Sequence, residues 1–461
     1  MRARLLRLVT AVLGVALLVG LAPQPVQAKT GQPVTRSGVL SDGSAYAIAV
    51  PAAFNGTLLL YSHGLVFPGD AETALLAPDP TTQQALLERG YALAGSAFGT
   101  GYAVERALRD QVELLDVFAY AIGKPKRTLA WGSSMGGMIT AELLERHPER
   151  FAGALPTCGL VAGSNGLWDT YLDTMFAIRT LLAPSITLTG DHDPFATVGA
   201  VTKALETAQA TPAGRARIAL AVSFSDMPGW KGAGSPRPDP ADVEAQERAQ
   251  FETLNEILVL LAVAERAEME QRAGGNPSTN VHVDYARQLR HSTVRKEVKA
   301  LYAKAGADLR ADLAVLDRAP RVSADAEARK YLKRFASFTG ELHGRPVLTL
   351  HNTGDGLAAP ESEQSYRTKV RRAGDKRLLR QLFVERAGHC TFTPAELVAS
   401  VQVLDQRVRS GHYPATNPAA MTKRAAALGP ALNGVTDDDS GDFIPVPPGF
   451  DHYRPGRFLR P

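Results

Sequence analysis

The chain has 461 residues, with 51 lysines and arginines against 47 aspartates and glutamates and a formal net charge of +4. Three of the positive charges belong to Arg2, Arg4 and Arg7, so the remainder of the chain has a net charge of only +1. Nucleic-acid binding requires a clustered basic face, and a balance this close to neutral does not indicate one. The length is ample for one large domain with an insertion.

The first 28 residues have the three regions of a secretory signal peptide. The three N-terminal arginines form a basic segment, residues 8–21 are apolar, and a small-residue cleavage site ends at Ala28. The apolar stretch is short for a membrane span, which needs about 20 residues, although an uncleaved anchor remains an alternative. We therefore predict that residues 1–28 are removed and that the mature protein is secreted, without a stable membrane span.

From residue 37 the hydrophobic pattern alternates between strands and helices. Residues 37–50 alternate apolar and polar side chains around a Ser-Asp-Gly turn, which predicts an antiparallel hairpin. The elements expected next are strand 57–61, helix 83–89, strand 91–97, helix 104–122, strand 128–131, helix 136–146 and strand 154–157. Strands that alternate with helices in this way indicate a mostly parallel, doubly wound sheet.

Residues 132–136 read Gly-Ser-Ser-Met-Gly and directly follow the apolar strand 128–131. In this G-x-S-x-G pattern the central serine lies on a sharp turn between a strand and a helix, which predicts Ser134 as a nucleophile. Side chains at Gly132 and Gly136 would collide with the flanking elements. The N–H of Met135, at the positive end of the helix, is free to bind an oxyanion. The pattern is weakly specific by itself, so the neighbouring segments must support it.

The alternation of strands and helices stops after residue 159. Residues 160–340 are rich in helix formers, and residues 242–273 predict one long helix or two. A buried strand at 346–351 then leads to Asp355, and a strand at 382–385 leads to His389.

The chain ends in two different kinds of segment. Residues 394–409 predict a helix that closes the sheet. Residues 410–461 are rich in proline and glycine and include Asp437-Asp438-Asp439, which predicts a surface-wrapped or partly disordered extension.

The chain order Ser134, Asp355, His389, with each residue just after a strand, resembles the α/β-hydrolase family. The resemblance covers about residues 37–160 and 340–409. It implies an α/β-hydrolase fold, in which Ser134 is the nucleophile, His389 the base and Asp355 the carboxylate that orients the imidazole.

Asp191 is the alternative acid, because it follows the apolar residues 185–188, which also look like a strand. Asp355 is preferred because its strand is the better one and its distance before His389 suits the last strand–helix–strand step.

The resemblance also predicts the organisation of the chain. Its expected parts are a signal peptide (1–28), a hydrolase core (29–159 and 341–409), a helical lid insertion (160–340) and a Pro- and Gly-rich extension (410–461). An insertion at that place implies a lid over the active site, and its size suggests a substrate larger than acetate. The backbone N–H groups of Leu65 and Met135 are the expected oxyanion donors, and His63 is expected to be structural.

The two cysteines are Cys158, after strand 154–157, and Cys390, next to His389. In this fold both would lie above the same sheet edge, and a proximal pair outside the cell tends to oxidise, so we predict a disulfide. Tannases and some feruloyl esterases have a related bond, but its first cysteine precedes the nucleophile, where this chain has Ser133. Only the histidine half matches, and two buried, unbonded thiols remain the alternative.

These features predict a secreted serine esterase that acts through an acyl-enzyme. A peptidase or amidase on the same fold is the second interpretation, with Glu244, Glu247 and Trp230 as insertion residues to hold a substrate amine. An acyltransferase and a non-catalytic binding protein are further alternatives.

No cofactor is expected, because the loop that begins Gly99-Thr100-Gly101 has Val104 in place of the third glycine of a dinucleotide site. No metal is expected either, since no residue spacing suggests a metal site.

Overall fold

The computed structural model describes residues 32–436 and 443–461. The predicted signal peptide and Asp437-Asp438-Asp439 therefore lie outside the described residues. Nine strands form one sheet in the order β1-β2-β4-β3-β5-β6-β7-β8-β11. Their bounds are β1 Val34–Val39, β2 Ala45–Val50, β3 Thr57–Ser62, β4 Ala92–Ser96, β5 Arg127–Ser133, β6 Gly153–Thr157, β7 Val347–Gly354, β8 Leu379–Ala387 and β11 Phe450–Asp451.

The middle of this sheet is parallel and its edges are antiparallel. Strands β4, β3, β5, β6, β7 and β8 pair in parallel, whereas β1 pairs antiparallel with β2, β2 with β4, and β11 with β8. The predicted fold class is thus confirmed, and the hairpin predicted at 37–50 is the pair β1–β2.

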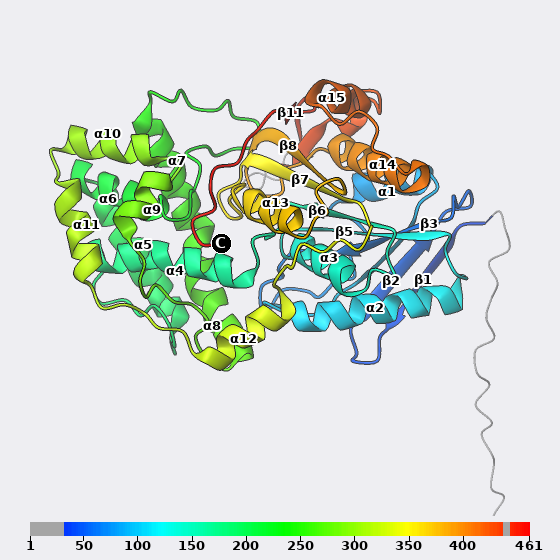
Figure 1. Ribbon diagram of the computed structural model, residues 1–461, viewed down its shortest axis with the longest axis horizontal. Helices are drawn as coiled ribbons and strands as arrows, with labels where there is room; N and C mark the ends of the chain where they lie inside the picture. Colours follow the sequence, from blue (N-terminus) through cyan, green and yellow to red (C-terminus); the bar gives the residue numbers. More distant parts are fainter. Residues whose placement is uncertain (1–31, 437–442) are drawn as a thin grey trace, which may run out of the picture.

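Helices cover both faces of the sheet, which explains why its central strands are apolar throughout. Alternate residues of β3 enter two separate cores, as the twofold period of a strand requires. Leu58 and Leu60 pack in the core that includes residues of α2 (Val104–Ala121) and α3 (Met135–Arg146). Leu59 and Tyr61 pack in the core that includes residues of α1 (Pro80–Glu88) and α14 (Pro394–Ser410). Figure 1 shows α2 and α3 on one side of the sheet and α1 and α14 on the other. The helix α13 (Ser362–Arg372) lies between β7 and β8 in the chain.

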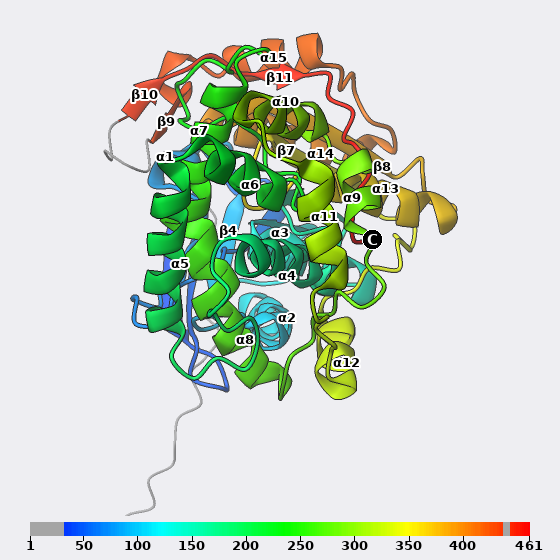
Figure 2. The ribbon, with the colours of Figure 1, turned by 90° about the vertical axis from the view of Figure 1, so that its left-hand side faces the viewer.

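The segment between β6 and β7, which we call the helical insertion (residues 160–340), contains no strand. Its helices are α4 Ser164–Leu181, α5 Pro194–Gln209, α6 Pro212–Val222, α7 Val243–Thr253, α8 Arg266–Ala273, α9 Tyr285–His291, α10 Arg295–Ala305, α11 Leu309–Arg318 and α12 Ala326–Phe335. They gather at one end of the sheet, with α4 in their middle (Figures 1 and 2).

The helix predicted at residues 242–273 is interrupted twice. Two π-helical stretches, η1 (Leu254–Leu258) and η2 (Leu261–Glu265), lie between α7 and α8. A π-helical turn widens the helix by one residue and is frequent at functional sites.

The C-terminal extension is more ordered than its composition predicts. It contains α15 (Pro418–Ala426), a 3₁₀ turn η3 (Pro430–Leu432) and the hairpin of β9 (Gly434–Thr436) with β10 (Phe443–Pro445). Strand β11 then joins the sheet edge, and the last residues run back to the helical insertion (Figure 1).

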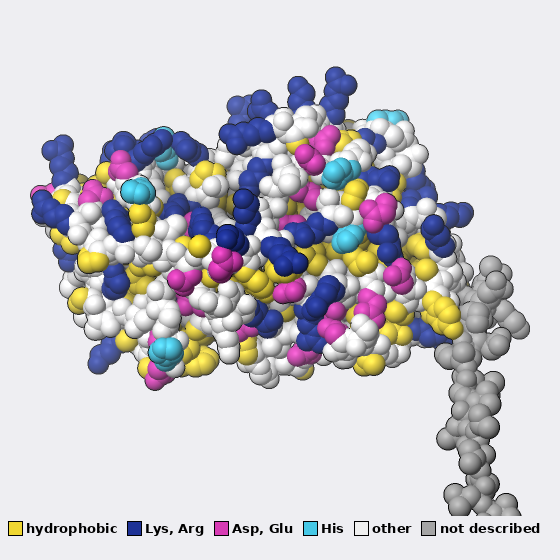
Figure 3. Space-filling view, turned by 60° about the horizontal axis from the view of Figure 1, so that its bottom comes forward, with side chains coloured by type: hydrophobic (Ala, Val, Ile, Leu, Met, Phe, Trp, Pro, Cys, Tyr) yellow, Lys and Arg dark blue, Asp and Glu magenta, His cyan; other side chains and the backbone are white. Residues whose placement is uncertain are grey.

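On the face drawn in Figure 3, acidic and basic side chains are interspersed over the surface. Among the described residues, no helix has both the length and the hydropathy needed to cross a bilayer.

Candidate active site

Ser134 lies at the turn from β5 into α3 and has a positive φ of 59°, with ψ −123°, a strained conformation for a residue with a side chain. The turn is crowded by backbone from β3 and the loop after it. A Cβ atom at Gly136 would lie 1.9 Å from the carbonyl oxygen of Ser62, and one at Gly132 would lie 2.5 Å from the same oxygen. Only glycine fits at either position, so these two residues allow the strained turn that exposes Ser134.

Three side chains from three strand ends meet at this turn. The Oγ of Ser134 lies 2.7 Å from Nε2 of His389, and Nδ1 of His389 lies 2.8 Å from Oδ2 of Asp355. Asp355 follows β7 and His389 follows β8, and parallel strands place their carboxyl ends at one edge of the sheet. The geometry allows the imidazole to accept the serine proton while its other nitrogen donates to the carboxylate.

Asp355 is fully buried and its carboxylate is held on both sides. Its Oδ1 accepts hydrogen bonds from the backbone N–H groups of Leu357 and Ala358, each at 2.9 Å. Burial alone would raise the pKa of Asp355, but the neighbouring imidazoles of His389 and His351 hold it well below its ordinary value. Asp355 therefore remains ionised at neutral pH.

A cavity of about 240 Å³, which we call the serine cavity, opens over Ser134. Its walls are mostly apolar and aromatic and come from the core, from α4 and from the π-helical region of the insertion. The lining residues are Gly64, Leu65, Phe67, Tyr102, Ser134, Met135, Leu160, Leu167, Trp168, Tyr171, Ile257, Leu261, Glu265, Leu357 and His389. Leu65 and Met135, the expected oxyanion donors, thus flank the same space as Ser134. Met135 is the first residue of α3, so its N–H has no intrahelical acceptor.

A second cavity of about 390 Å³ lies on another side of His389 and contacts neither Ser134 nor Leu65. It shares His389, Ile257 and Leu357 with the serine cavity. Trp230 and several glycines line it. The imidazole therefore stands between two spaces, which suits a substrate whose scissile bond lies beside it.

The structure contains the predicted disulfide between Cys158 and Cys390, with a Cα–Cα distance of 5.2 Å. Both cysteines have positive φ, 45° and 59° respectively. The bond joins the end of β6 to the residue after His389, so it ties down the loop that presents the imidazole.

Other residues singled out from the sequence lie elsewhere. Asp191, the alternative acid, is in the loop between α4 and α5, because residues 185–188 do not form a strand. His63 is buried and stacks on Phe98 with ring centroids 3.8 Å apart, and its Nδ1 contacts the carbonyl oxygen of Gly64. Glu244 is exposed and paired with Lys304.

Glu247 is buried on α7, where it accepts a hydrogen bond from Gln209. It lines neither cavity beside His389.

Two acidic or basic groups of the site gave no signal in the sequence. His351, on β7, lies 3.4 Å from Asp355, but a lone histidine in an apolar strand has no motif around it. Glu265 lines the serine cavity from η2, and its inward direction depends on how the insertion packs.

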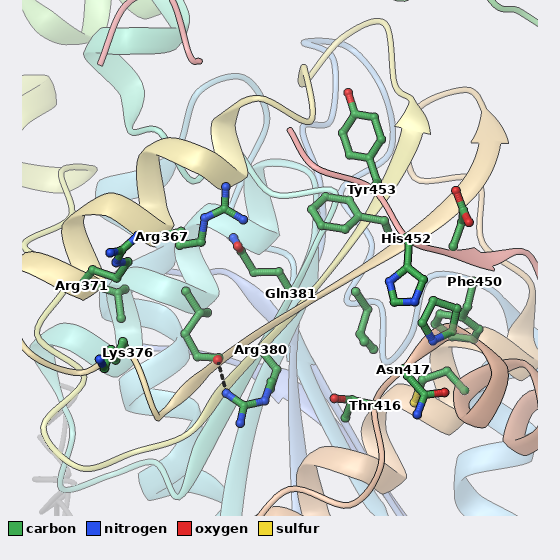
Figure 4. A pocket seen from close by; sticks show the side chains of 17 residues that line it. Arg367, Arg371, Lys376, Arg380, Gln381, Thr416, Asn417, Phe450, His452 and Tyr453 are labelled. Atoms are coloured by element: carbon green, nitrogen blue, oxygen red, sulfur yellow. Dashed lines mark hydrogen bonds between the residues drawn. The ribbon is translucent and has the colours of Figure 1, made fainter. Parts of the chain in front are cut away.

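A separate basic cavity of about 330 Å³ lies at the sheet edge, between α13, β8 and the C-terminal extension. Figure 4 shows Arg367, Arg371 and Lys376 on one side of it and His452 and Tyr453 on the other. It shares no lining residue with the serine cavity. In the described part of the chain, no group of three or more His, Cys, Asp or Glu side chains is placed to hold a metal ion.

The parallel strand order with its antiparallel β2, the serine turn after β5, and the acid and histidine after β7 and β8 define the α/β-hydrolase fold. Over 414 residues it is 28% identical to the o-phthalyl amidase of Xanthobacter agilis, covering 83% of this chain and 88% of that protein. No family model matches the chain.

Solved structures with similar chains include two proteins from Aspergillus oryzae. An esterase matches 83% of this chain and 80% of its own, with 13% identity and a TM-score of 0.41. Feruloyl esterase B matches 83% and 81%, with 13% identity and a TM-score of 0.38. These scores are below 0.5, so the fold assignment rests on strand order and site geometry.

Proposed function

We propose that this protein is a secreted serine hydrolase that cleaves carboxylic esters through an acyl-enzyme. The observation that carries the proposal is the unbroken contact from Ser134 through His389 to Asp355, with distances of 2.7 and 2.8 Å. A serine hydroxyl is a weak nucleophile until a base accepts its proton. The contacts provide that base, together with a buried carboxylate to stabilise the imidazolium.

In the proposed acylation, Oγ of Ser134 attacks the substrate carbonyl carbon and its proton moves to Nε2 of His389. The carbonyl oxygen becomes an oxyanion, which accepts hydrogen bonds from the backbone N–H groups of Leu65 and Met135. Each such donor contributes about 3 kcal/mol to transition-state stabilisation. The bond to the leaving group then breaks, and the leaving alcohol takes the proton from His389.

In the proposed deacylation, His389 accepts a proton from a water molecule that attacks the acyl carbon. The second tetrahedral intermediate collapses, the bond to Oγ breaks, and Ser134 recovers its proton from His389. The free acid departs, so the net reaction is hydrolysis of one ester bond with all protons returned. Asp355 stays ionised throughout.

The leaving group must lie beside His389, since that residue protonates it. We therefore assign the second cavity, which includes Trp230, to the leaving group and the serine cavity to the acyl group. The walls of the serine cavity are mostly apolar, which favours an acyl group with an apolar frame.

Amide hydrolysis is the second candidate function, and one observation favours it. The curated relative, similar over 83% of this chain, is an o-phthalyl amidase. The same three side chains can serve both reactions. An amide differs from an ester in that His389 must protonate a leaving amine instead of a leaving alcohol.

Secretion is the remaining part of the proposal. It is supported by the N-terminal pattern of residues 1–28 and by the Cys158–Cys390 disulfide, since such bonds persist in oxidising compartments.

Labelling with a fluorophosphonate probe and hydrolysis of p-nitrophenyl esters and nitroanilides test the proposal together. We expect Ser134→Ala to abolish labelling and to lower kcat by about 10⁴-fold or more. Ser133→Ala is the matched control, because Ser133 is the neighbouring hydroxyl and bonds to Thr157 at 2.9 Å. Labelling that persists in the Ser134→Ala protein would overturn the assignment of the nucleophile. Faster nitroanilide than ester cleavage would make the protein an amidase.

A further inference from the structure

Glu265 is a buried carboxylic acid without a partner. Glu265 is the last residue of η2, only 3% of its surface is exposed, and it lines the serine cavity. Among the residues that the structure describes, it makes no hydrogen bond or ion pair, and its Oε2 atom is fully enclosed. Buried polar groups are nearly always hydrogen-bonded, and burying an unpaired carboxylate is costly, so such a group indicates a missing partner.

The basic side chains near Glu265 are already bound elsewhere. Arg266, the next residue, donates to the Trp168 carbonyl at 2.8 Å and to the Ser278 hydroxyl at 3.0 Å. Arg272 pairs with Glu268 and donates to the carbonyl of Thr100 at 2.8 Å. Burial raises the pKa of Glu265 to about 7; the charge of Glu268 contributes to the rise, and the charge of Arg272 opposes it. The protein itself therefore brings no cation into direct contact with this carboxylate.

The walls around Glu265 suit a cation with an apolar frame. Tyr102, Trp168 and Tyr171 form an edge-to-face series, with ring centroids 5.4 and 5.7 Å apart. Aromatic faces attract cations, although Arg266 already lies over Trp168, 5.2 Å from the ring centroid. The residues that line the serine cavity include no lysine or arginine, so no permanently cationic side chain there would pair with an anionic acyl group.

A larger groove of about 940 Å³ adjoins the serine cavity and shares Phe67 and Glu265 with it. The groove is also lined by four other carboxylic acids and by no lysine or arginine; the four are Asp191, Glu268, Glu270 and Asp325. Two of them are paired with arginines, but the excess of acidic groups remains. Such a groove concentrates cations at the opening and steers them inward.

We propose that the carboxylate of Glu265 binds the protonated amine of the substrate's acyl part, so that the substrates are esters or amides of amino acids or other amine-bearing acids with an apolar frame. This inference rests on the proposed function, because the acyl group occupies the serine cavity only if Ser134 is the nucleophile. It assigns to Glu265 the choice of substrate and leaves the chemistry to Ser134 and His389.

A matched pair of substrates tests the proposal: p-nitrophenyl 4-(aminomethyl)benzoate, which is cationic, and p-nitrophenyl 4-ethylbenzoate, its neutral isostere. We expect the wild-type protein to prefer the cationic ester by about tenfold or more in kcat/KM, because a desolvated charge pair is strongly favourable. In Glu265→Gln the ratio of kcat/KM for the cationic ester to that for the neutral ester should fall close to one. Glu244→Gln, an exposed glutamate of the insertion, should keep the full preference.

Binding without chemistry separates this proposal from the proposed function. Ser134→Ala protein should bind 4-(aminomethyl)benzamide more tightly than 4-ethylbenzamide in calorimetry, and adding Glu265→Gln should remove the difference. Equal binding of both amides, or equal cleavage of both esters by an active enzyme, would overturn the role of Glu265 while leaving the hydrolase intact. Absence of labelling at Ser134 with a preserved amine preference would overturn the proposed function alone.

Discussion

The imidazole of His351 lies 3.4 Å from Oδ2 of Asp355, the same oxygen that contacts His389 at 2.8 Å. His351 is fully buried, and its Nε2–H donates to the carbonyl oxygen of Ala358 at 2.8 Å. Its Nδ1 faces the carboxylate of Glu363 at 3.3 Å. Both ring nitrogens therefore face acceptors, an arrangement that the doubly protonated imidazolium satisfies best.

The charge of His351 follows from these neighbours. Burial alone would lower the pKa of His351, but hydrogen bonds to Asp355 and Glu363 and the charges of both carboxylates raise it to about 10. The protein thus holds a buried cation, His351, beside Asp355. That cation helps to keep Asp355 ionised in a fully buried position.

We predict that His351→Gln impairs the site without removing any atom that would touch substrate. Without the cation, the pKa of Asp355 rises toward the value that burial favours. We expect kcat to fall about tenfold or more and the acid limb of the kcat/KM profile to move to higher pH. A variant with lower stability but an unchanged pH profile would show that His351 is only a packing residue.

The pH dependence of stability gives a second measurement on His351. Its pKa is raised from 6.5 in the unfolded chain to about 10 in the folded protein, so its contribution is complete below about pH 6.5 and disappears as the pH rises through about 10. The melting temperature of the wild type should therefore fall between pH 7 and 10, and that of His351→Gln should fall less. Parallel curves would contradict a charged His351.

Gly136→Ala should disrupt the nucleophile turn. The added methyl carbon would lie 1.9 Å from the Ser62 carbonyl and 2.3 Å from the His63 carbonyl, both backbone atoms that cannot move aside. We expect a loss of about 3 kcal/mol or more in the free energy of unfolding, measured by urea denaturation, together with loss of fluorophosphonate labelling.

Gly199→Ala is the matched control for that change. Gly199 lies inside α5, and a Cβ atom there would have no neighbour within 4 Å. Alanine favours the helix, so this variant should be more stable than the wild type by about 0.5–1 kcal/mol. Equal effects of the two substitutions would contradict the close approach at the turn.

Reduction of the disulfide should affect activity as well as stability. The bond closes a chain separation of 232 residues and holds Cys390, with its positive φ, next to His389. A double Cys158→Ala, Cys390→Ala variant should lose about 3 kcal/mol of stability and should have a lower kcat, because the histidine loop is no longer tethered. A reductant should lower the melting temperature of the wild type but leave the double variant unchanged.

Much of the core could be predicted from the sequence because its signals are local. The serine turn needs Gly132 and Gly136 for steric reasons, and the apolar strands before Asp355 and His389 end where their polar residues begin. A local signal can also mislead, as Asp191 shows. An apolar run followed by aspartate has the same sequence pattern whether the run forms a strand or a loop, so the sequence left Asp191 as an alternative acid.

The remaining features depend on contacts between distant segments. Nothing local distinguishes Glu265 from the exposed glutamates of the same helical region, because it is the fold that brings it to one cavity with Phe67 and Tyr102, which are distant in the chain. The partners of His351 are likewise set by the path of the loop after β7. Composition also underpredicted the order of the C-terminal extension, whose helix and strands are held by tertiary contacts.

The most specific of those contacts is made by Arg460, the penultimate residue. Its guanidinium lies 2.7 Å from Asp173 and 3.2 Å from Asp169, which are one turn apart on α4. Asp173 is fully buried, and burial raises its pKa to about 6 even though Arg460 opposes the rise. The same helix carries Trp168 and Tyr171 into the serine cavity, so the C-terminus helps to position a wall of the candidate active site.

We therefore predict that Arg460→Met costs about 3–5 kcal/mol of stability, because it leaves Asp173 buried without its cation. It should also raise KM more than it lowers kcat, since α4 carries cavity residues and not the reacting groups. Arg457→Met, at an exposed position three residues earlier, is the control and should be neutral. Adding Asp173→Asn to Arg460→Met should recover part of the lost stability, because the buried charge is then gone. If the double variant is as unstable as the sum of the two single changes, the pair does not act as a unit and the C-terminus is held by Phe458 and its apolar contacts instead.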